Sequence, residues 1–241
     1  MARDEIVNIR RGVTDGMPIG LGYLSVSFAF GIFAVSSGLS VLEAILISVF
    51  NLTSAGQLAA VPIIASAGSF IELALTQLVI NLRYSLMSVS LSQKLGASVR
   101  LRDRFWIAYA NTDEVFAVSS GKGAPVGRLY MLGLIIPPIL GWSLGTALGA
   151  AAGNILPEIL VCALGIAIYA MFIAIVVPVA KSEWKVALAA LLAIGLSCLF
   201  TYAPVLNKIP SGFVIIICAV SVSALMALLF PCPEESEEAE L

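Results

Sequence analysis

Long apolar runs separated by short polar stretches extend along almost the whole chain. A helix needs roughly 20 mainly apolar residues to cross a hydrocarbon core about 30 Å thick. Seven runs approach or exceed that length: Met17–Gly38, Val41–Ala67, Ser69–Leu91, Leu129–Gly153, Ile155–Val179, Trp184–Pro204 and Pro210–Phe230. The pattern therefore predicts an all-α fold, a polytopic integral membrane helix bundle with about six to seven transmembrane segments.

The polar remainder is too small to form a soluble domain beside this bundle. Of the 241 residues, 60% are hydrophobic and 12% are charged, whereas soluble domains average about 25% charged residues. We predict one membrane domain over 1–241, with a cytoplasmic N-terminal segment (1–16), a transmembrane bundle (17–230) and a disordered acidic cytoplasmic tail (231–241). A net charge of -2 leaves no basic surface for nucleic acid. The expected location is a cell membrane that the chain crosses several times.

Basic residues predict which ends of these segments face the cytoplasm, because Lys and Arg accumulate there in short loops. The connection Ser92–Arg128 is rich in Lys and Arg and is therefore expected to be cytoplasmic. Arg3, Arg10 and Arg11 favour the same side, yet three complete crossings would separate them from this connection. One of the first three segments must then be irregular. The second is the best candidate, because the polar and helix-weakening stretch 51–57 interrupts it.

An internal similarity supports a different topology. Gly38, Glu43 and Pro62 recur as Gly153, Glu158 and Pro178 at nearly the same spacing. Repeats of this kind are common in transporters. If the similarity reflects two related halves, the second segment matches the fifth, spans the membrane completely and leaves the N-terminus outside. The sequence leaves both topologies open.

Arg83 lies in the middle of the third apolar run, where an arginine costs about 2.5–3.5 kcal/mol on insertion scales. Its expected partners are Asp113 and Glu114, because a guanidinium pairs well with a carboxylate. A carboxylate in such surroundings has an environment-dependent pKa, so both acids are candidates for proton coupling. Two interpretations of Arg83 remain: a purely structural ion pair, or a role in substrate binding or gating. The acids themselves either contact Arg83 or simply lie in the cytoplasmic loop.

The interrupted second segment is the predicted substrate site. A helix break at Ser54, Gly56 and Gln57 frees backbone dipoles for the charged groups of a zwitterion. The adjoining apolar residues are the expected wall for its side chain: Leu58, Val61 and Ile64. The alternative is a kinked but packed helix.

Glycines of the fourth segment are spaced mostly at four residues: Gly133, Gly141, Gly145, Gly149 and Gly153. Small residues at this spacing allow a neighbouring helix to approach closely. We therefore expect one face of this segment to pack tightly against another helix.

Several enzymatic functions are excluded by missing residues. The chain has no histidine, so neither a Ser-His nucleophilic site nor a His-x-x-x-His metal site can form. There is also no phosphate-binding loop of the Gly-x-x-x-x-Gly-Lys-Ser/Thr type. We expect no enzyme activity, no metal and no cofactor, which leaves movement of a solute across the membrane.

Five short motifs in order resemble the AzlC family, the large subunits of bacterial two-component branched-chain amino acid exporters. These motifs are Gly16-x-Pro18, Ser54-Ala55-Gly56-Gln57, Asn81-Leu82-Arg83-Tyr84, Thr112-Asp113-Glu114 and Trp142 with Gly145-Thr146. The resemblance extends from about Val13 to Phe230. The stretch Asn51-Leu52-Thr53 departs from it, where the family pattern is more apolar.

The resemblance implies export of valine, leucine, isoleucine and methionine, driven by the proton motive force. It also implies a small hydrophobic partner subunit of the AzlD type. The residues carried over to a functional role are Gly56, Gln57, Asn81, Arg83, Asp113 and Glu114. A membrane channel and a membrane assembly subunit without transport activity are the alternatives.

Overall fold

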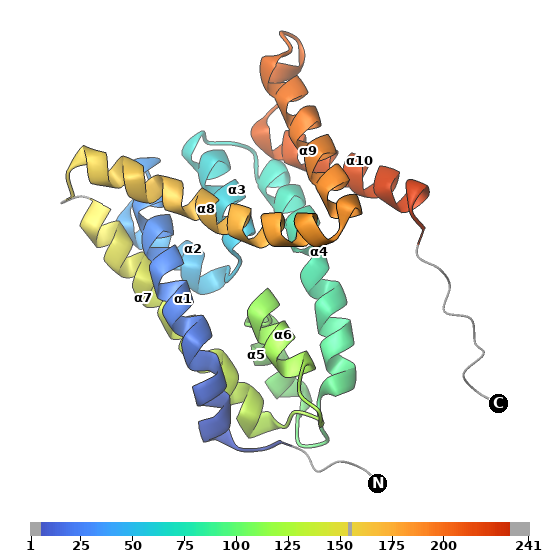
Figure 1. The fold of residues 1–241 in the computed structure, drawn as a ribbon. Coiled ribbons are helices and arrows are strands. Elements are labelled where there is room, and N and C mark those ends of the chain that lie inside the picture. Colours follow the sequence, from blue (N-terminus) through green and yellow to red (C-terminus); the bar gives the residue numbers. More distant parts are fainter. Residues whose placement is uncertain (1–5, 154–155, 232–241) are drawn as a thin grey trace. The chain divides into compact units, whose positions relative to one another are not determined.

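The computed structural model describes residues 6–153 and 156–231, and this part of the chain is almost entirely helical (Figure 1). It contains ten α-helices and a short 3-10 helix: α1 Ile9–Ser36, α2 Val41–Phe50, α3 Ser54–Ala65, α4 Phe70–Lys94, α5 Leu101–Tyr109, α6 Asp113–Ser120, α7 Arg128–Gly153, α8 Glu158–Ser182, α9 Trp184–Tyr202, η1 Leu206–Lys208 and α10 Ser211–Leu229. The predicted all-α class is confirmed. The predicted acidic tail from Cys232 onward lies outside the described residues.

Four of these helices have both the length and the hydropathy that a membrane crossing requires: α1, α7, α9 and α10. Helix α4 is also long, with 25 residues, but Glu72, Arg83 and Lys94 make it more polar. The structure is therefore that of a membrane protein with four span-capable helices, and the total of six to seven segments stays a prediction.

The first helix begins earlier than its apolar run suggested. The prediction placed its start at Met17, whereas α1 starts at Ile9. Asn8 caps this start, because its side chain accepts a hydrogen bond from the backbone N–H of Arg11 at 3.2 Å. The predicted N-terminal segment 1–16 is thus partly helical.

The predicted interruption of the second segment is present, but it is shorter than expected. Helix α2 ends at Phe50, residues 51–53 are non-helical, and α3 starts at Ser54. The Thr53 hydroxyl accepts the backbone N–H of Gly56 at 3.1 Å and so starts the new helix. Gly56 and Gln57 therefore belong to α3 rather than to the break.

The fifth segment does not share this interruption. Helix α8 runs from Glu158 to Ser182 as one element. The alternative in which the second segment spans completely and matches the fifth is therefore wrong for these described helices.

Helices α2 and α3 form a first helical hairpin, in which Gln57 of α3 donates to Ser48 of α2 across the break. A second helical hairpin, α5 and α6, occupies the connection that the sequence assigned to a polar loop. Helices α5 and α6 are joined by a turn at residues 110–112. Ile107 and Val115 are buried in the same apolar cluster as Tyr130 and Leu134 of α7. This burial explains why a stretch too short to span still forms two ordered helices.

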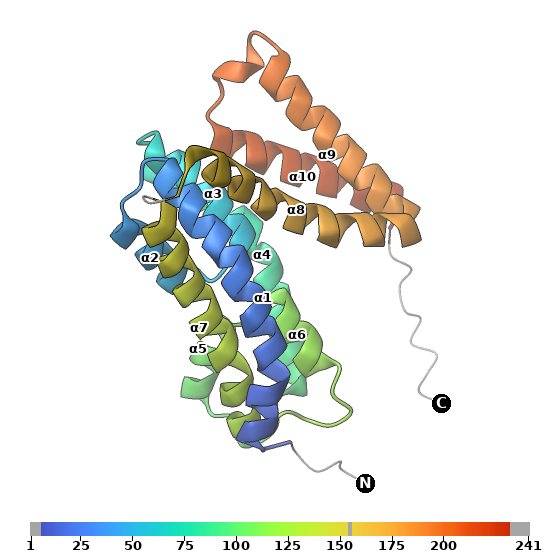
Figure 2. The ribbon, with the colours of Figure 1, turned by 60° about the vertical axis from the view of Figure 1, so that its left-hand side comes forward.

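The chain divides into two compact units, 1–172 and 173–241. In the first unit, α1 and α7 run parallel and side by side along their length (Figures 1 and 2). A Cβ placed on Gly149 would lie 2.0 Å from the backbone oxygen of Phe28, and one on Gly16 would lie 2.4 Å from that of Leu134. The glycine face predicted for the fourth segment is confirmed, and its partner is α1.

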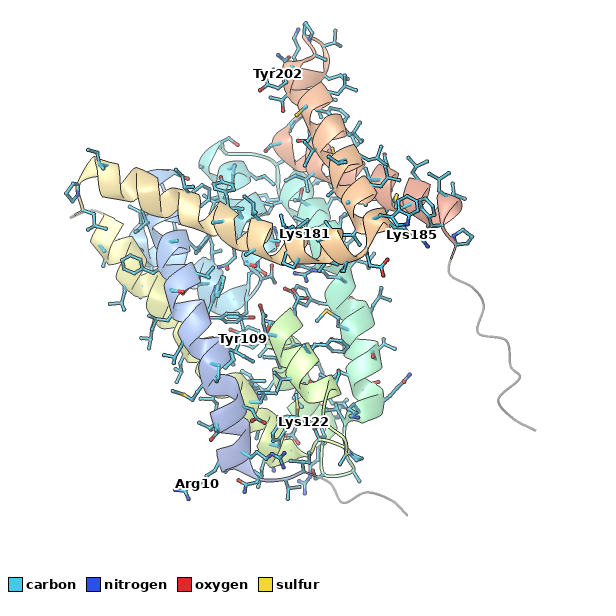
Figure 3. The ribbon with its side chains drawn as sticks, viewed as in Figure 1. Arg10, Tyr109, Lys122, Lys181, Lys185 and Tyr202 are labelled. Carbon is cyan, nitrogen blue, oxygen red and sulfur yellow. The ribbon has the colours of Figure 1, made fainter. Side chains whose placement is uncertain are left out.

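Three parts of the chain meet at one end of this unit. The backbone N–H of Ile6 donates to Pro125 at 2.9 Å, and that of Gly96 donates to Val126 at 2.9 Å. The start of α1, the end of α4 and the start of α7 are thus neighbours. Figure 3 shows Arg10 and Lys122 at this end. Arg10 and Arg11 of α1 and the basic connection therefore share one end of the unit, as the interrupted-segment topology predicted.

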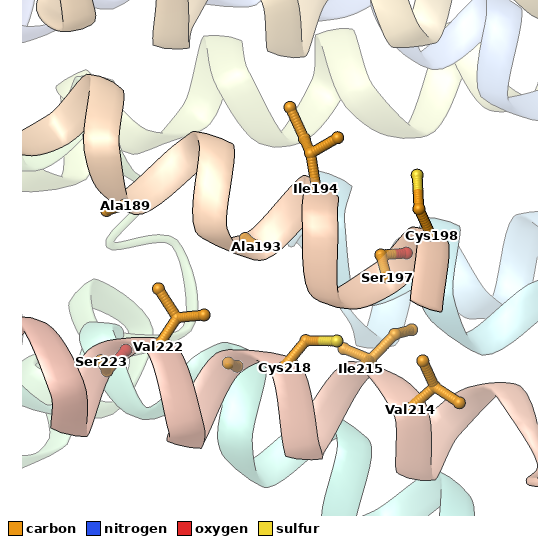
Figure 4. A pocket seen from close by; sticks show the side chains of 11 residues that line it. Ala189, Ala193, Ile194, Ser197, Cys198, Val214, Ile215, Cys218, Val222 and Ser223 are labelled. Carbon is orange, nitrogen blue, oxygen red and sulfur yellow. The ribbon is translucent and has the colours of Figure 1, made fainter. Parts of the chain in front are cut away.

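In the second unit, α9 and α10 form an antiparallel helical hairpin closed by η1. Trp184, at the start of α9, packs edge-on against Phe230, just after α10, with ring centroids 5.1 Å apart. A groove of about 630 Å³ runs between the two helices, with the free thiols of Cys198 and Cys218 among its mainly apolar lining (Figure 4).

Candidate functional site

Each hairpin of the first unit has a non-helical tip, residues 51–53 between α2 and α3 and residues 110–112 between α5 and α6. The two tips meet around a small polar cavity. Figures 1 and 2 show α2 and α3 beside one half of the α1–α7 pair, and α5 and α6 beside the other half. The Tyr109 hydroxyl of the second tip donates to the backbone oxygen of Val49 near the first. A cavity of about 240 Å³ lies there, lined by Phe50, Asn51, Leu52, Thr53, Asn81, Tyr84, Ala108, Tyr109, Asn111 and Thr112.

One face of α4 holds both tips. Its polar residues Gln77, Asn81, Tyr84 and Ser88 follow one another at intervals of four, three and four, which places them on one side of a helix. Gln77 Nε2 donates to the backbone oxygen of Gly56 at 2.8 Å, and Asn111 Nδ2 of the second tip donates to Ser88 Oγ at 3.1 Å. The sequence analysis missed Gln77 and Ser88, although this spacing was a visible signal.

Asn81, which was predicted as a site residue, does line the cavity. Its Nδ2 donates to Gln77 Oε1 at 3.2 Å. The same Gln77 oxygen accepts Asn51 Nδ2 at 3.1 Å. This amide cluster ties the first tip to α4 without any charged group.

The expected contact between Arg83 and Asp113 is present. The guanidinium of Arg83 pairs with the carboxylate of Asp113 at the start of α6. It also donates to the Tyr84 hydroxyl at 3.0 Å and lies 4.5 Å from the centroid of that ring. The two charged side chains are 42% and 51% exposed within the chain, so the pair lies beside the cavity rather than sealed in the core.

Glu114 has a different partner from the one predicted. It accepts a hydrogen bond from the Tyr23 hydroxyl of α1. The Tyr23 ring in turn packs edge-on against Trp142 of α7, with centroids 5.1 Å apart. Sequence reasoning missed Tyr23, because nothing in the local pattern of α1 distinguishes it from an ordinary interfacial tyrosine.

Gln57 is fully buried in a hydrogen-bonded network away from the cavity lining. Its Oε1 accepts Trp142 Nε1–H at 2.9 Å, and its Nε2 donates to Ser48 Oγ at 2.8 Å. Ser48 also shares a hydrogen bond with Thr146 at 2.7 Å. Both ends of the Gln57 amide are therefore occupied, and this geometry braces the first hairpin against α7.

The other predicted residues of the second segment lie in α3. Ser54 is half-buried at its start, and Gly56 is buried. A Cβ on Gly56 would lie 2.2 Å from Thr53 Oγ1 and 2.6 Å from Gln77 Oε1, so only glycine fits there.

The proposed apolar wall is not at the cavity. Val61 and Leu58 belong to a separate apolar cluster with Phe30, and Ile64 is exposed. The cavity takes its apolar surface from Phe50 and Leu52 instead.

Ion pairs fix the end of the unit where the basic residues gather. Lys122 Nζ lies 2.6 Å from Asp15 Oδ2, and Arg128 Nε lies 2.9 Å from Asp103 Oδ1. Asp103, in the first turn of α5, also accepts the backbone N–H of Arg100 at 3.0 Å. Burial raises the pKa of Asp103, but the hydrogen bond from Arg100 and the charge of Arg128 outweigh it and hold this pKa below its ordinary value.

These features define a class of protein: an integral membrane protein built from helices, with broken helical segments around a polar cavity, consistent with a role in membrane transport. Among the described residues, no group of three His, Cys, Asp or Glu side chains could hold a metal ion.

Comparison with known proteins identifies the family. The family model described as AzlC protein matches residues 18–156, which include both hairpins and the cavity. The chain belongs to the AzlC family.

Two relatives have curated descriptions. The chain is 33% identical over 176 residues to an uncharacterised membrane protein of Archaeoglobus fulgidus, covering 72% of this chain and 77% of that protein. It is 30% identical over 147 residues to the inner membrane protein YgaZ of Escherichia coli K12, covering 59% of this chain and 60% of YgaZ. No solved structure matches the chain.

Proposed function

We propose that this chain is a secondary transporter that exports hydrophobic amino acids, among them valine, leucine, isoleucine and methionine, and that it catalyses no chemical reaction. The observation that carries the proposal is the meeting of two broken helical segments, α2–α3 and α5–α6, around a small polar cavity. Non-helical backbone at membrane depth is tolerated only where it is buried in protein or lines a cavity. Transporters commonly form their substrate sites from such discontinuous helices.

The size of the cavity supports a small solute. Its 240 Å³ equals the liquid volume of about eight water molecules at roughly 30 Å³ each. Pockets for drug-sized ligands measure about 300–1,000 Å³. A free amino acid is therefore a better match in size than a nucleotide or a peptide.

The proposed topology has six crossing helices, α1, α4, α7, α8, α9 and α10, and two re-entrant hairpins that enter from opposite sides. The end with Arg10, Lys122 and Arg128 would face the cytoplasm, by the positive-inside rule. The membrane is then the cytoplasmic membrane of a bacterial cell. YgaZ is described as an inner membrane protein, which agrees with this location.

Energy coupling is assigned to the second hairpin. Asp113 and Glu114 open α6 and contact Arg83 and Tyr23 beside the cavity. Carboxylates inside the membrane region, paired with other polar groups, are the usual components of proton relays. We assign proton coupling to these two acids, and we propose a small hydrophobic subunit of the AzlD type as the partner that completes the exporter.

The test is leucine efflux from cells preloaded with labelled leucine, expressing this chain with and without a small hydrophobic subunit of the AzlD type. We expect efflux to rise only when both are present, to saturate with internal leucine, and to fall when an uncoupler abolishes the proton gradient.

Other results of this efflux experiment would support a different function. Efflux that neither saturates nor responds to the uncoupler would identify a channel. Efflux equal to that of cells lacking the chain would contradict transport of these amino acids. An Arg83→Ala variant with wild-type expression and wild-type efflux would show that the charged pair has no part in the pathway.

A further inference from the structure

The cavity between the hairpin tips carries no charged side chain, although charged residues surround it. Its polar lining consists of amides and hydroxyls: Asn51, Thr53, Asn81, Tyr84, Tyr109, Asn111 and Thr112. Such groups cannot neutralise a net charge that has been removed from water, and an uncompensated buried charge is strongly disfavoured. The lining therefore fits a ligand whose charges sum to zero.

Four helix ends converge on the same cavity. The last residues of α2 and α5, Phe50 and Tyr109, line it together with the residues directly before α3 and α6, Thr53 and Thr112. A helix start carries a partial positive charge and a helix end a partial negative one. The cavity thus offers both signs of partial charge within a small volume, which matches a ligand with one positive and one negative group.

Two amide oxygens at the cavity lack hydrogen-bond partners among the described residues. Asn111 is 2% exposed. The Nδ2 of Asn111 donates to Ser88, whereas the Oδ1 of Asn111 has no partner. The Nδ2 of Asn81 is held by Gln77, and its Oδ1 likewise has no partner. Buried acceptors are normally satisfied, so an N–H donor is missing here. An ammonium group carries three such donors.

We propose that this cavity binds the zwitterionic part of an α-amino acid. The ammonium donates to Oδ1 of Asn111 and of Asn81, the carboxylate lies at the start of α3 beside Thr53, and the apolar side chain packs against Leu52 and Phe50. The assignment rests on the proposed function for its ligand class, and it moves the site from Gln57 and Ser54 to the two hairpin tips.

The test measures binding directly, in the full chain co-expressed with the small subunit and placed in lipid nanodiscs. The probes are leucine, leucinamide, which lacks the carboxylate, and 4-methylpentanoate, which lacks the ammonium. We expect wild-type protein to bind leucine at least tenfold more tightly than either analogue, because a hydrogen bond to a charged group changes affinity by about tenfold or more.

Three variants separate recognition from folding. Asn111→Leu is expected to weaken leucine binding at least tenfold. Asn111→Asp, of nearly the same shape, gives the cavity a negative charge and should shift preference towards the cationic leucinamide by at least tenfold. The control is Thr76→Val, which removes another buried hydroxyl without a partner, on α4 but outside the cavity lining. It should leave all three affinities unchanged.

The outcomes distinguish failure of the proposed binding site from failure of the proposed export function. Unchanged leucine affinity in both Asn111→Leu and Asn81→Leu, in a chain that still exports leucine, would refute the site and leave export standing. Equal binding of leucine and leucinamide by wild-type protein would refute recognition of the zwitterion. A wild-type chain that neither exports nor binds leucine would refute the proposed function, and with it the ligand assigned to this cavity.

Discussion

The two helical hairpins of the first unit share one plan but are anchored by different chemistry. In each, a short non-helical stretch ends at a threonine that precedes the second helix, Thr53 before α3 and Thr112 before α6. The first hairpin is held by neutral groups, with Gln57 on Trp142 and Asn51 on Gln77. The second is held largely by ionised groups: Asp113 on Arg83, Glu114 on Tyr23 and Asp103 on Arg128.

Because of this difference, the two hairpins should respond differently to protonation. Amide hydrogen bonds do not depend on the protonation of a side chain, whereas the contacts of an ionised carboxylate change once that carboxylate gains a proton. We therefore expect the first hairpin to stay in place during transport and the second to move when its acids gain or lose protons. Substitutions in one hairpin at a time test this difference.

The largest effect is expected from the ion pair of the second hairpin. Asp113→Asn leaves Arg83 without a charged partner, and an uncompensated arginine at membrane depth costs about 2.5–3.5 kcal/mol. We expect a loss of stability of that order and loss of export, while the double variant Arg83→Ala, Asp113→Ala recovers part of the stability. Unfolding in mixed detergent, arranged as a double-mutant cycle, measures the coupling.

The exposed Arg102 at the base of α5 provides the control for this cycle. Arg102→Ala should change stability little, because Arg102 forms no close ion pair among the described residues and an exposed cation contributes little. Additive effects of the Arg83 and Asp113 substitutions would contradict an energetically coupled pair.

A smaller effect is expected from the neutral brace of the first hairpin. Gln57→Leu keeps the volume similar but strands the Trp142 N–H, and a buried unsatisfied donor costs about 1–3 kcal/mol. Thermal stability in detergent should fall accordingly, with leucine affinity retained in the folded fraction. Gln93→Leu, at an exposed position of α4, is the matched control. If Gln57→Leu lowered affinity without lowering stability, Gln57 would be a binding residue after all.

The smallest effect concerns pH and the base of the second hairpin. The pKa of Asp103 is lowered in the folded protein, so its stabilising contribution is complete above the ordinary value of about 3.9. It is lost as the pH falls through the lower pKa of the folded state. We expect α5 to lose hydrogen-exchange protection below about pH 4, after correction for intrinsic rates, while α3 keeps its protection.

Asp103→Asn checks the origin of this acid sensitivity. The variant should have a less protected α5 at neutral pH and no further specific loss of protection in acid. Parallel loss of protection in α3 and α5 of the wild-type chain would show that the two hairpins do not differ in this respect.

Local properties of the sequence determined much of this protein. The apolar runs predicted the long helices to within a few residues at most ends, and the polar stretch after Phe50 predicted the break between α2 and α3. The distribution of arginine and lysine predicted that the N-terminus and the basic connection share one side. The isolated charge of Arg83 pointed to Asp113 and Glu114, and the structure pairs it with Asp113. Each of these inferences depends on neighbouring residues or on the free-energy cost of burying one charged side chain. Both can be read from the sequence alone.

Tertiary structure alone decided the second hairpin and the site. Local hydropathy does not predict α5 and α6, because their apolar residues Ile107 and Val115 lie among charged neighbours. These two residues become buried because they pack in one cluster with Tyr130 and Leu134 of α7. The sequence predicts Gln57 as a binding residue, and only the fold shows that Trp142, 85 positions away, donates to its amide oxygen. The cavity exists only where two tips about 60 residues apart meet α4. Hydropathy and helix capping are local, whereas the partner of a buried polar group is chosen by packing between distant segments.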